Sequence, residues 1–185
     1  MVRRTSNGGG GTGGFTLVEM LTTVAALTIV LGLAVSLARF VRNRSADAAT
    51  RRMLGRLEGV AEQYRRRTGA YPALPAIVPD GGVGGGRLDD QALYRAAMAN
   101  NRAMVQALRG YRDLWDEAFG DLPSAMQNEA TLRDAWGTPV VFVPPRAANV
   151  GMSPQDRYFV FSAGPDRRFV TIDDNLYSYE ISLVR

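Results

Sequence analysis

Aspartate, glutamate, tyrosine and arginine are the titratable side chains of this sequence, because its 185 residues include no histidine, cysteine or lysine. Their absence excludes Ser-His-Asp triads, Cys-His pairs, histidine or thiolate metal sites, and the usual general base near neutral pH. Adjacent aspartates occur at Asp89-Asp90 and Asp173-Asp174, and both pairs stand in sequence typical of loops or helix caps. Catalysis would therefore need carboxylates, tyrosine or arginine alone.

One acid, Glu19, stands at the start of a long apolar run. Met20 to Ala38 contains 19 residues and no charge, close to the ~20 apolar residues that a helix needs to cross a bilayer. An unpaired carboxylate there costs on the order of 3 kcal/mol, so Glu19 needs a cationic partner. In the alternative, Glu19 lies at headgroup level, where its charge suits the helix dipole. A core helix of a soluble protein is the other alternative, but it would need only one apolar face.

The helical pattern continues beyond the apolar run. No proline occurs between Arg39 and Arg67, and an apolar stripe recurs there at steps of three and four residues. The stripe consists of Leu54, Leu57, Ala61 and Tyr64. Gly69 provides a C-terminal cap, with Pro72 just beyond it. We expect one helix from Phe15 to about Thr68, membrane-spanning over 15–38 and amphipathic over 39–68.

Arginines are concentrated in the second half of this helix. The chain carries a formal net charge of +4, and residues 39–67 hold nine arginines against three acids. A solvated helix face beside a membrane is the simplest interpretation, and attraction to anionic lipid headgroups is the second. Nucleic-acid binding is not expected, because the whole chain is only mildly basic.

The remaining sequence predicts a globular part over residues 69–185. Prolines and the glycine-rich run 81–86 indicate a loop, and 88–119 has a helical pattern with a break at Asn100-Asn101 or at Gly110. Its expected core residues are Leu93, Ala97, Val105, Leu108, Leu114 and Trp115. Four β-branched or aromatic runs then predict short strands at Val140–Val143, Tyr158–Ala163, Phe169–Ile172 and Leu176–Leu183. The predicted fold class is α+β: a long N-terminal helix packed on a small C-terminal antiparallel sheet, with an additional helical insert.

The stretch Gly14-Phe15-Thr16-Leu17-Val18-Glu19 follows a short basic, glycine-rich leader and precedes the apolar run. Over Gly13 to Ala38 this arrangement resembles the N-terminal signal of type IV prepilins and type II secretion pseudopilins. The resemblance implies that prepilin peptidase cuts between Gly14 and Phe15, removes residues 1–14 and methylates Phe15, leaving 171 residues. Gly14 would let an extended backbone enter the protease cleft without a side chain. The resemblance also implies that Glu19 meets the freed amine of Phe15 on a neighbouring subunit during assembly.

Three later segments, Tyr64–Pro72, Asp134–Pro139 and Phe161–Asp174, follow the order seen in major pseudopilins. This weaker resemblance implies a structural Ca²⁺ held in the last segment by Asp166, Asp173 and Asp174, whose oxygens are of the kind that calcium prefers. In the alternative, these carboxylates belong to an exposed turn and bond its own backbone. The insert from Gly81 to Leu132 and the cations Arg167 and Arg168 depart from the family pattern.

The resemblance implies a structural subunit of a secretion or pilus-type filament. Its partners would be prepilin peptidase, other pilin-like subunits, an inner-membrane assembly platform and membrane lipids. We expect a single-pass protein of the bacterial inner membrane with an extracytoplasmic head; this orientation follows from the resemblance, because Arg3 and Arg4 are balanced by the arginines after Ala38. Two other hypotheses stay open. The chain is a membrane-tethered binding module that is not cut after Gly14, or a secreted protein cut after Ser36-Leu37-Ala38.

Overall fold

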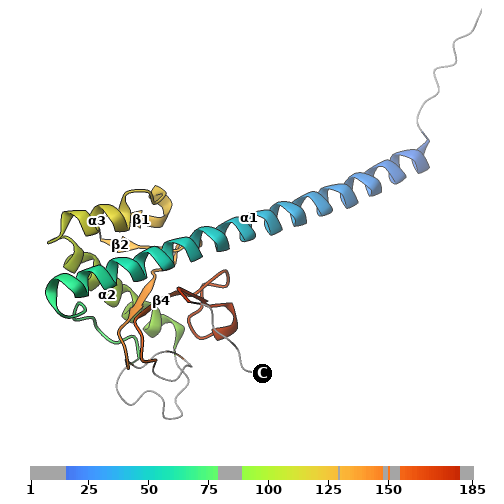
Figure 1. Ribbon diagram of the computed structural model, residues 1–185. Coiled ribbons are helices and arrows are strands. Elements are labelled where there is room, and N and C mark those ends of the chain that lie inside the picture. The colour runs from blue at the N-terminus through green and yellow to red at the C-terminus, as the bar shows by residue number, and fades with distance from the viewer. Residues whose placement is uncertain (1–15, 79–88, 129, 148–149, 151–154, 180–185) are drawn as a thin grey trace, which may run out of the picture. The chain divides into compact units, whose positions relative to one another are not determined.

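A computed structural model describes residues 16–78, 89–128, 130–147, 150 and 155–179. Gly14 and Phe15 lie outside the described residues. By its internal contacts the chain divides into two units, residues 1–42 and residues 43–185, and each is described by itself. The fold class is α+β, with one long helix, two shorter helices and small antiparallel sheets (Figure 1).

The long helix α1 spans Leu17–Thr68 and contributes to both units. It ends where predicted, because Gly69 adopts a φ of 84° and its N–H bonds to the Arg65 carbonyl at 2.8 Å. A positive φ suits glycine, which has no Cβ to clash with the preceding turn. In the 43–185 unit, α1 turns one stripe of side chains inward: Thr50, Met53, Leu54, Leu57, Val60 and Ala61 are buried. The predicted stripe is thus confirmed, with Tyr64 packed partly buried at its end.

Two further helices follow the loop after α1. Helix α2 spans Asp90–Leu108, and its N-cap Asp89 accepts hydrogen bonds from the N–H groups of Gln91 and Ala92. Helix α3 spans Arg112–Phe119. The break between α2 and α3 therefore falls around Gly110, and the alternative break at Asn100-Asn101 is wrong.

Two small antiparallel sheets complete the 43–185 unit. Strands β3 (Val141–Val143), β4 (Phe159–Ser162) and β5 (Leu176–Tyr177) form one sheet in that order, with Val141 opposite Phe161 and Phe161 opposite Tyr177. A hairpin of β1 (Gln127–Asn128) and β2 (Thr131–Leu132) forms the other. Short 3₁₀ turns lie at η1 (Ser124–Met126) and η2 (Ile172–Asp174).

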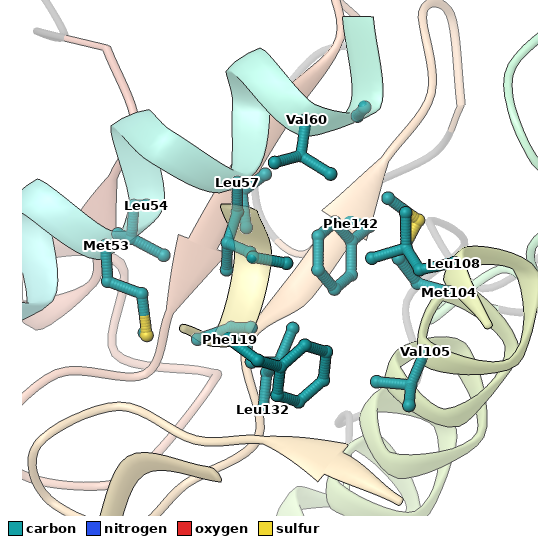
Figure 2. Close-up of a cluster of buried hydrophobic side chains, with 14 of the residues drawn as sticks. Met53, Leu54, Leu57, Val60, Met104, Val105, Leu108, Phe119, Leu132 and Phe142 are labelled. Atoms are coloured by element: carbon teal, nitrogen blue, oxygen red, sulfur yellow. The ribbon is translucent and has the colours of Figure 1, made fainter. Parts of the chain in front are cut away.

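Both faces of the larger sheet are covered, which explains why its strands are apolar without alternation. One face packs against α1, α2 and α3 in the cluster of Figure 2, where Phe142 of β3 lies beside Leu108 of α2. The other face packs its residues Val141, Phe159, Phe161 and Tyr177 with Leu93 and Ala97 of α2. Of the predicted core residues, Leu93, Ala97, Val105, Leu108 and Leu114 are buried, and Trp115 packs partly buried against the first cluster.

Asn100 and Asn101 do not break α2. Their side chains form hydrogen bonds with backbone N–H and carbonyl groups of neighbouring segments. Asn100 donates to the Pro75 and Phe142 carbonyls, both at 2.9 Å, and accepts from the Phe142 N–H. Asn101 donates to the carbonyls of Leu132 and Val140 at 2.9 and 2.7 Å and accepts from the Leu132 N–H. Both side chains are buried with all these bonds made, so α2 is fixed to the strands.

The predicted strand Phe169–Ile172 is wrong. Residues 169 and 170 form a turn, and Ile172 begins the 3₁₀ turn η2. Phe169 is buried by contact of its ring with Phe161, at a centroid distance of 6.0 Å, and not by strand pairing. Within the predicted strand Leu176–Leu183, the structure gives β5 over Leu176–Tyr177, and residues 180–183 lie outside the described part.

Candidate functional site at the start of the long helix

Glu19 occupies the first turn of α1. Thr16, the residue before the helix, accepts the Glu19 N–H on its side-chain oxygen at 3.2 Å, while its carbonyl accepts the Met20 N–H at 3.1 Å. These bonds make Thr16 the N-cap and Glu19 the third helical residue, as in the Ser/Thr-x-x-Glu pattern that begins many helices. This pattern was not predicted, although Thr16 and Glu19 alone are enough to indicate it.

The segment of α1 that follows Glu19 is apolar on every side. Its large apolar side chains from Leu17 to Val41 are all exposed, from 44% at Val35 to 84% at Leu17. The hydroxyls of Thr22 and Thr23 bond back to the Glu19 carbonyl, and that of Thr28 bonds to the Val24 carbonyl at 2.8 Å. Hydroxyls satisfied in this way do not oppose transfer into lipid. By length and composition, α1 is a candidate membrane-spanning helix.

Glu19 has no cation within ion-pair distance among residues 16–78, 89–128, 130–147, 150 and 155–179. The next charged residue along the helix is Arg39, twenty positions away, which is about 30 Å at the helical rise. A neutralising charge from within this helix is therefore out of reach. The predicted partner, the amine of Phe15 on another copy, falls outside the described residues.

The loop around Asp166, Asp173 and Asp174 is held mainly by bonds within the loop itself. Asp166 accepts the Arg168 N–H at 2.8 Å, and Asp173 and Asp174 lie exposed in η2. Gly164 has a φ of 70°, and a Cβ on it would stand 2.0 Å from the Asp174 carbonyl oxygen, so the two ends of the loop touch. In the part of the chain that the structure describes, acidic side chains do not gather in threes around a common point. Calcium binding at Asp166, Asp173 and Asp174 stays a prediction.

A groove of about 650 Å³ lies on α1, lined by its residues Gly55, Glu58, Gly59 and Glu62 and walled by Tyr71 and Tyr158. Its carboxylates are already paired: Arg157 donates to Glu58 at 2.7 Å, and Glu62 bonds to Arg65 and to the Tyr71 hydroxyl. The Arg65 and Tyr71 hydrogen bonds lower the pKa of Glu62 to about 2. Burial raises the pKa of Tyr158, so its hydroxyl stays protonated. An acid fixed as a carboxylate is a poor proton donor near neutral pH, so Glu62 is not suited to acid catalysis. The paired groups of this groove instead stabilise the fold.

Asp134 is a buried carboxylate that connects two of the segments named above. It accepts the N–H groups of Trp136 and Thr138 at 3.0 and 2.8 Å, and the hydroxyls of Thr138 and Ser162, the latter at 2.6 Å. Ser162 in turn accepts the Gly164 N–H at 3.0 Å. Four donors surround the charge, which compensates for its burial. The sequence named this aspartate only as part of a motif. Three of its donors are local, but the bond from Ser162 joins it to a segment 28 residues away.

The segments 64–72, 134–139 and 161–174 all belong to the 43–185 unit, and contacts link them. The second and third segments are joined by the hydrogen bond between Asp134 and Ser162. Tyr71 of the first segment stacks on Tyr158, three residues before the third segment, with ring centroids 4.5 Å apart. Ala135 also donates its N–H to the Thr50 hydroxyl of α1 at 3.2 Å. No protein-family model, curated protein or solved structure matches this chain.

Proposed function

We propose that this chain is a pilin-like structural subunit, a pseudopilin of a bacterial type II secretion or type IV pilus-like filament, and not an enzyme. It is held in the inner membrane by the first part of α1, with residues 69–185 as its extracytoplasmic head. Prepilin peptidase cuts after Gly14, an inner-membrane platform extracts the subunit, and helices of successive copies pack in the filament core. Helices that are apolar on all sides exchange lipid contacts for contacts with one another, so packing decides their association.

The observation that carries this proposal is the setting of Glu19. Its carboxylate stands in the first turn of a helix whose apolar surface is uncovered from Leu17 to Val41. It has no cation partner in the described part of the chain. An unpaired charge becomes more unfavourable the deeper it enters the apolar layer, up to about 3 kcal/mol at the bilayer centre. An amine from a second copy supplies the missing charge, and this requirement couples membrane insertion to assembly.

The helix also argues against a secreted protein cut after Ala38. Ser36, Leu37 and Ala38 lie inside α1, with helical residues on both sides. A peptide bond must be extended to enter a protease cleft, and here it would have to leave a continuous run of helical hydrogen bonds.

The capping geometry offers a second explanation of Glu19, and substitutions separate the two. Glu19→Gln keeps a side chain favoured at this helical position but removes the charge. Thr16→Ala removes the N-cap oxygen and keeps the charge. If Glu19 pairs with an amine, both Glu19→Gln and Glu19→Ala insert into the membrane but fail to assemble, whereas Thr16→Ala assembles.

The readouts are membrane fractionation, the mass of the mature N-terminus and the amount of sheared filament. We expect methylated Phe15 as the first residue in every variant, since none alters Gly14 or Phe15. Normal filament yield from Glu19→Gln would refute charge pairing in favour of the cap. A mature protein beginning at Met1 or Val2 would indicate the tethered module, and one beginning at Arg39 the secreted protein.

A further inference from the structure

The arginines of α1 differ in whether the protein provides them with a partner. Of the six from Arg51 onward, four are ion-paired with acids, among them Arg51 with Asp47 at 3.2 Å and Arg56 with Asp121 at 3.7 Å. The three nearest the apolar run are Arg39, Arg42 and Arg44. Within the described part of the chain, none of these three makes an ion pair or a side-chain hydrogen bond, and all three are exposed. Their charges are available to a partner other than the described residues.

Their position along α1 indicates which partner this is. The uncharged run 20–38 covers about 28 Å at the helical rise, which matches the ~30 Å hydrocarbon core of a bilayer. The six residues 39–44 then fall within the headgroup layer, roughly 5–8 Å thick. Phe40 and Val41 between the arginines are 60% and 57% exposed. Apolar side chains beside cations are suited to this interface, because the apolar groups face the acyl chains while the cations face the phosphates.

We propose that Arg39, Arg42 and Arg44 form a binding site for the phosphate of anionic lipid headgroups. A guanidinium presents a planar fork of N–H donors that matches phosphate oxygens, and it stays charged at every physiological pH. The ligand class is a phosphodiester lipid with net negative charge, such as phosphatidylglycerol. This proposal rests on one part of the proposed function, namely that α1 spans the membrane. A bound anionic lipid would fix the depth of α1 and would have to be released when the subunit is extracted into a filament.

The test compares lipid retention by the full chain in detergent. Native mass spectrometry measures the ratio of dioctanoyl phosphatidylglycerol to dioctanoyl phosphatidylcholine that stays bound from an equimolar mixture. The test variant carries Arg39→Gln, Arg42→Gln and Arg44→Gln. The matched control carries Arg51→Gln, Arg52→Gln and Arg56→Gln, which removes the same charge from the same helix farther from the apolar run. A parallel titration with inorganic phosphate separates a lipid site from a site for free phosphate.

We expect the unaltered chain and the control to prefer phosphatidylglycerol, and the test variant to lose that preference by at least about tenfold. Equal loss in the control would overturn the proposal, because it would reflect total charge and not these three residues. An unchanged preference in the test variant, or displacement of the lipid by equimolar phosphate, would also overturn it. Alkaline carbonate treatment of membranes tests the spanning helix separately. Release of the protein from the membrane by carbonate would contradict the proposed function, whereas the ratio of bound lipids tests only the arginine site.

Discussion

At the scale of single residues, Asp134 shows how one carboxylate can organise a fold that lacks histidine and cysteine. It is 1% exposed and accepts two N–H groups and two hydroxyls from residues between 136 and 162. Next to it, Gly137 takes a φ of 90° and its N–H returns to the Asp134 carbonyl at 3.0 Å. The turn and the loop after β4 are thus built around a single charge. Removing that charge leaves several buried donors without acceptors.

We predict that Asp134→Ala lowers the free energy of unfolding by about 3–5 kcal/mol, because three buried donors and one partly buried N–H lose their acceptor at once. Thermal or urea unfolding of the detergent-solubilised protein measures the change. The control is Asp166→Ala, whose partly exposed carboxylate accepts one N–H bond, from Arg168; it should cost less than about 1 kcal/mol. Similar losses in the two variants would show that Asp134 is not the organising group.

At the scale of elements, the glycines of α1 have different roles although they share one residue type. Gly69 ends the helix with a φ of 84°, while Gly55 and Gly59 lie inside it and line the groove. A Cβ built at either interior position meets no atom within 4 Å. Glycine is therefore required by the backbone only at Gly69.

The same substitution should have opposite effects at the two kinds of position. Gly69→Ala forces a side chain into a left-handed conformation and should lower stability by about 1 kcal/mol. Gly59→Ala should raise stability by roughly 0.5–1 kcal/mol, because alanine favours a helix and the space is open. Melting temperatures of the two variants test this, and a loss of stability in Gly59→Ala would mean that its open space is used in the folded protein.

The elements also show how far the sequence alone could predict this fold. The α1 stripe at Leu54, Leu57 and Ala61 was predicted because helical periodicity is a local signal, and so was the Gly69 cap. The continuity of α2 was not predicted, because asparagine is a poor helix former unless distant backbone groups bond to it, as they do here for Asn100. The error at Phe169 has the same origin: local composition favoured a strand, while contacts distant in sequence decided a turn.

The candidate site was predictable to a similar degree. Glu19 stands out because a charge interrupts a run that is otherwise uncharged, and that contrast is visible without a structure. Its N-cap partner Thr16 was also visible but was missed. The arrangement of the aspartates around Asp166 could not be predicted, because spacing along the chain does not determine where carboxylates in a loop point.

At the scale of the whole molecule, the core belongs to one part of the chain. The buried apolar residues begin at Met53 and continue to Tyr177, and all lie within the 43–185 unit. Residues 17–41 contribute exposed apolar side chains only. Folding of the 43–185 unit should therefore not require the residues before it.

We predict that a fragment of residues 43–185 is soluble without detergent and unfolds cooperatively in urea. A second fragment that begins at Leu57 lacks the buried residues Thr50, Met53 and Leu54. It should lose more than about 4 kcal/mol, because two large buried apolar side chains are removed. Tryptophan fluorescence of Trp115 and Trp136 reports the transition. A 43–185 fragment that stays unfolded would show that the preceding helix is needed for folding.

The hydrogen bonds of Asn100 also limit how the 43–185 units of two molecules can touch one another. β3 is an outer strand of its sheet, and Phe142 directs both its N–H and its carbonyl at Asn100. Such groups on an outer strand are normally a template on which a strand of another molecule can add. With Asn100 occupying them, that edge is closed to β-augmentation. Molecules at high local concentration are thereby protected from amyloid-like pairing at β3, and contact between them at this edge is left to side chains.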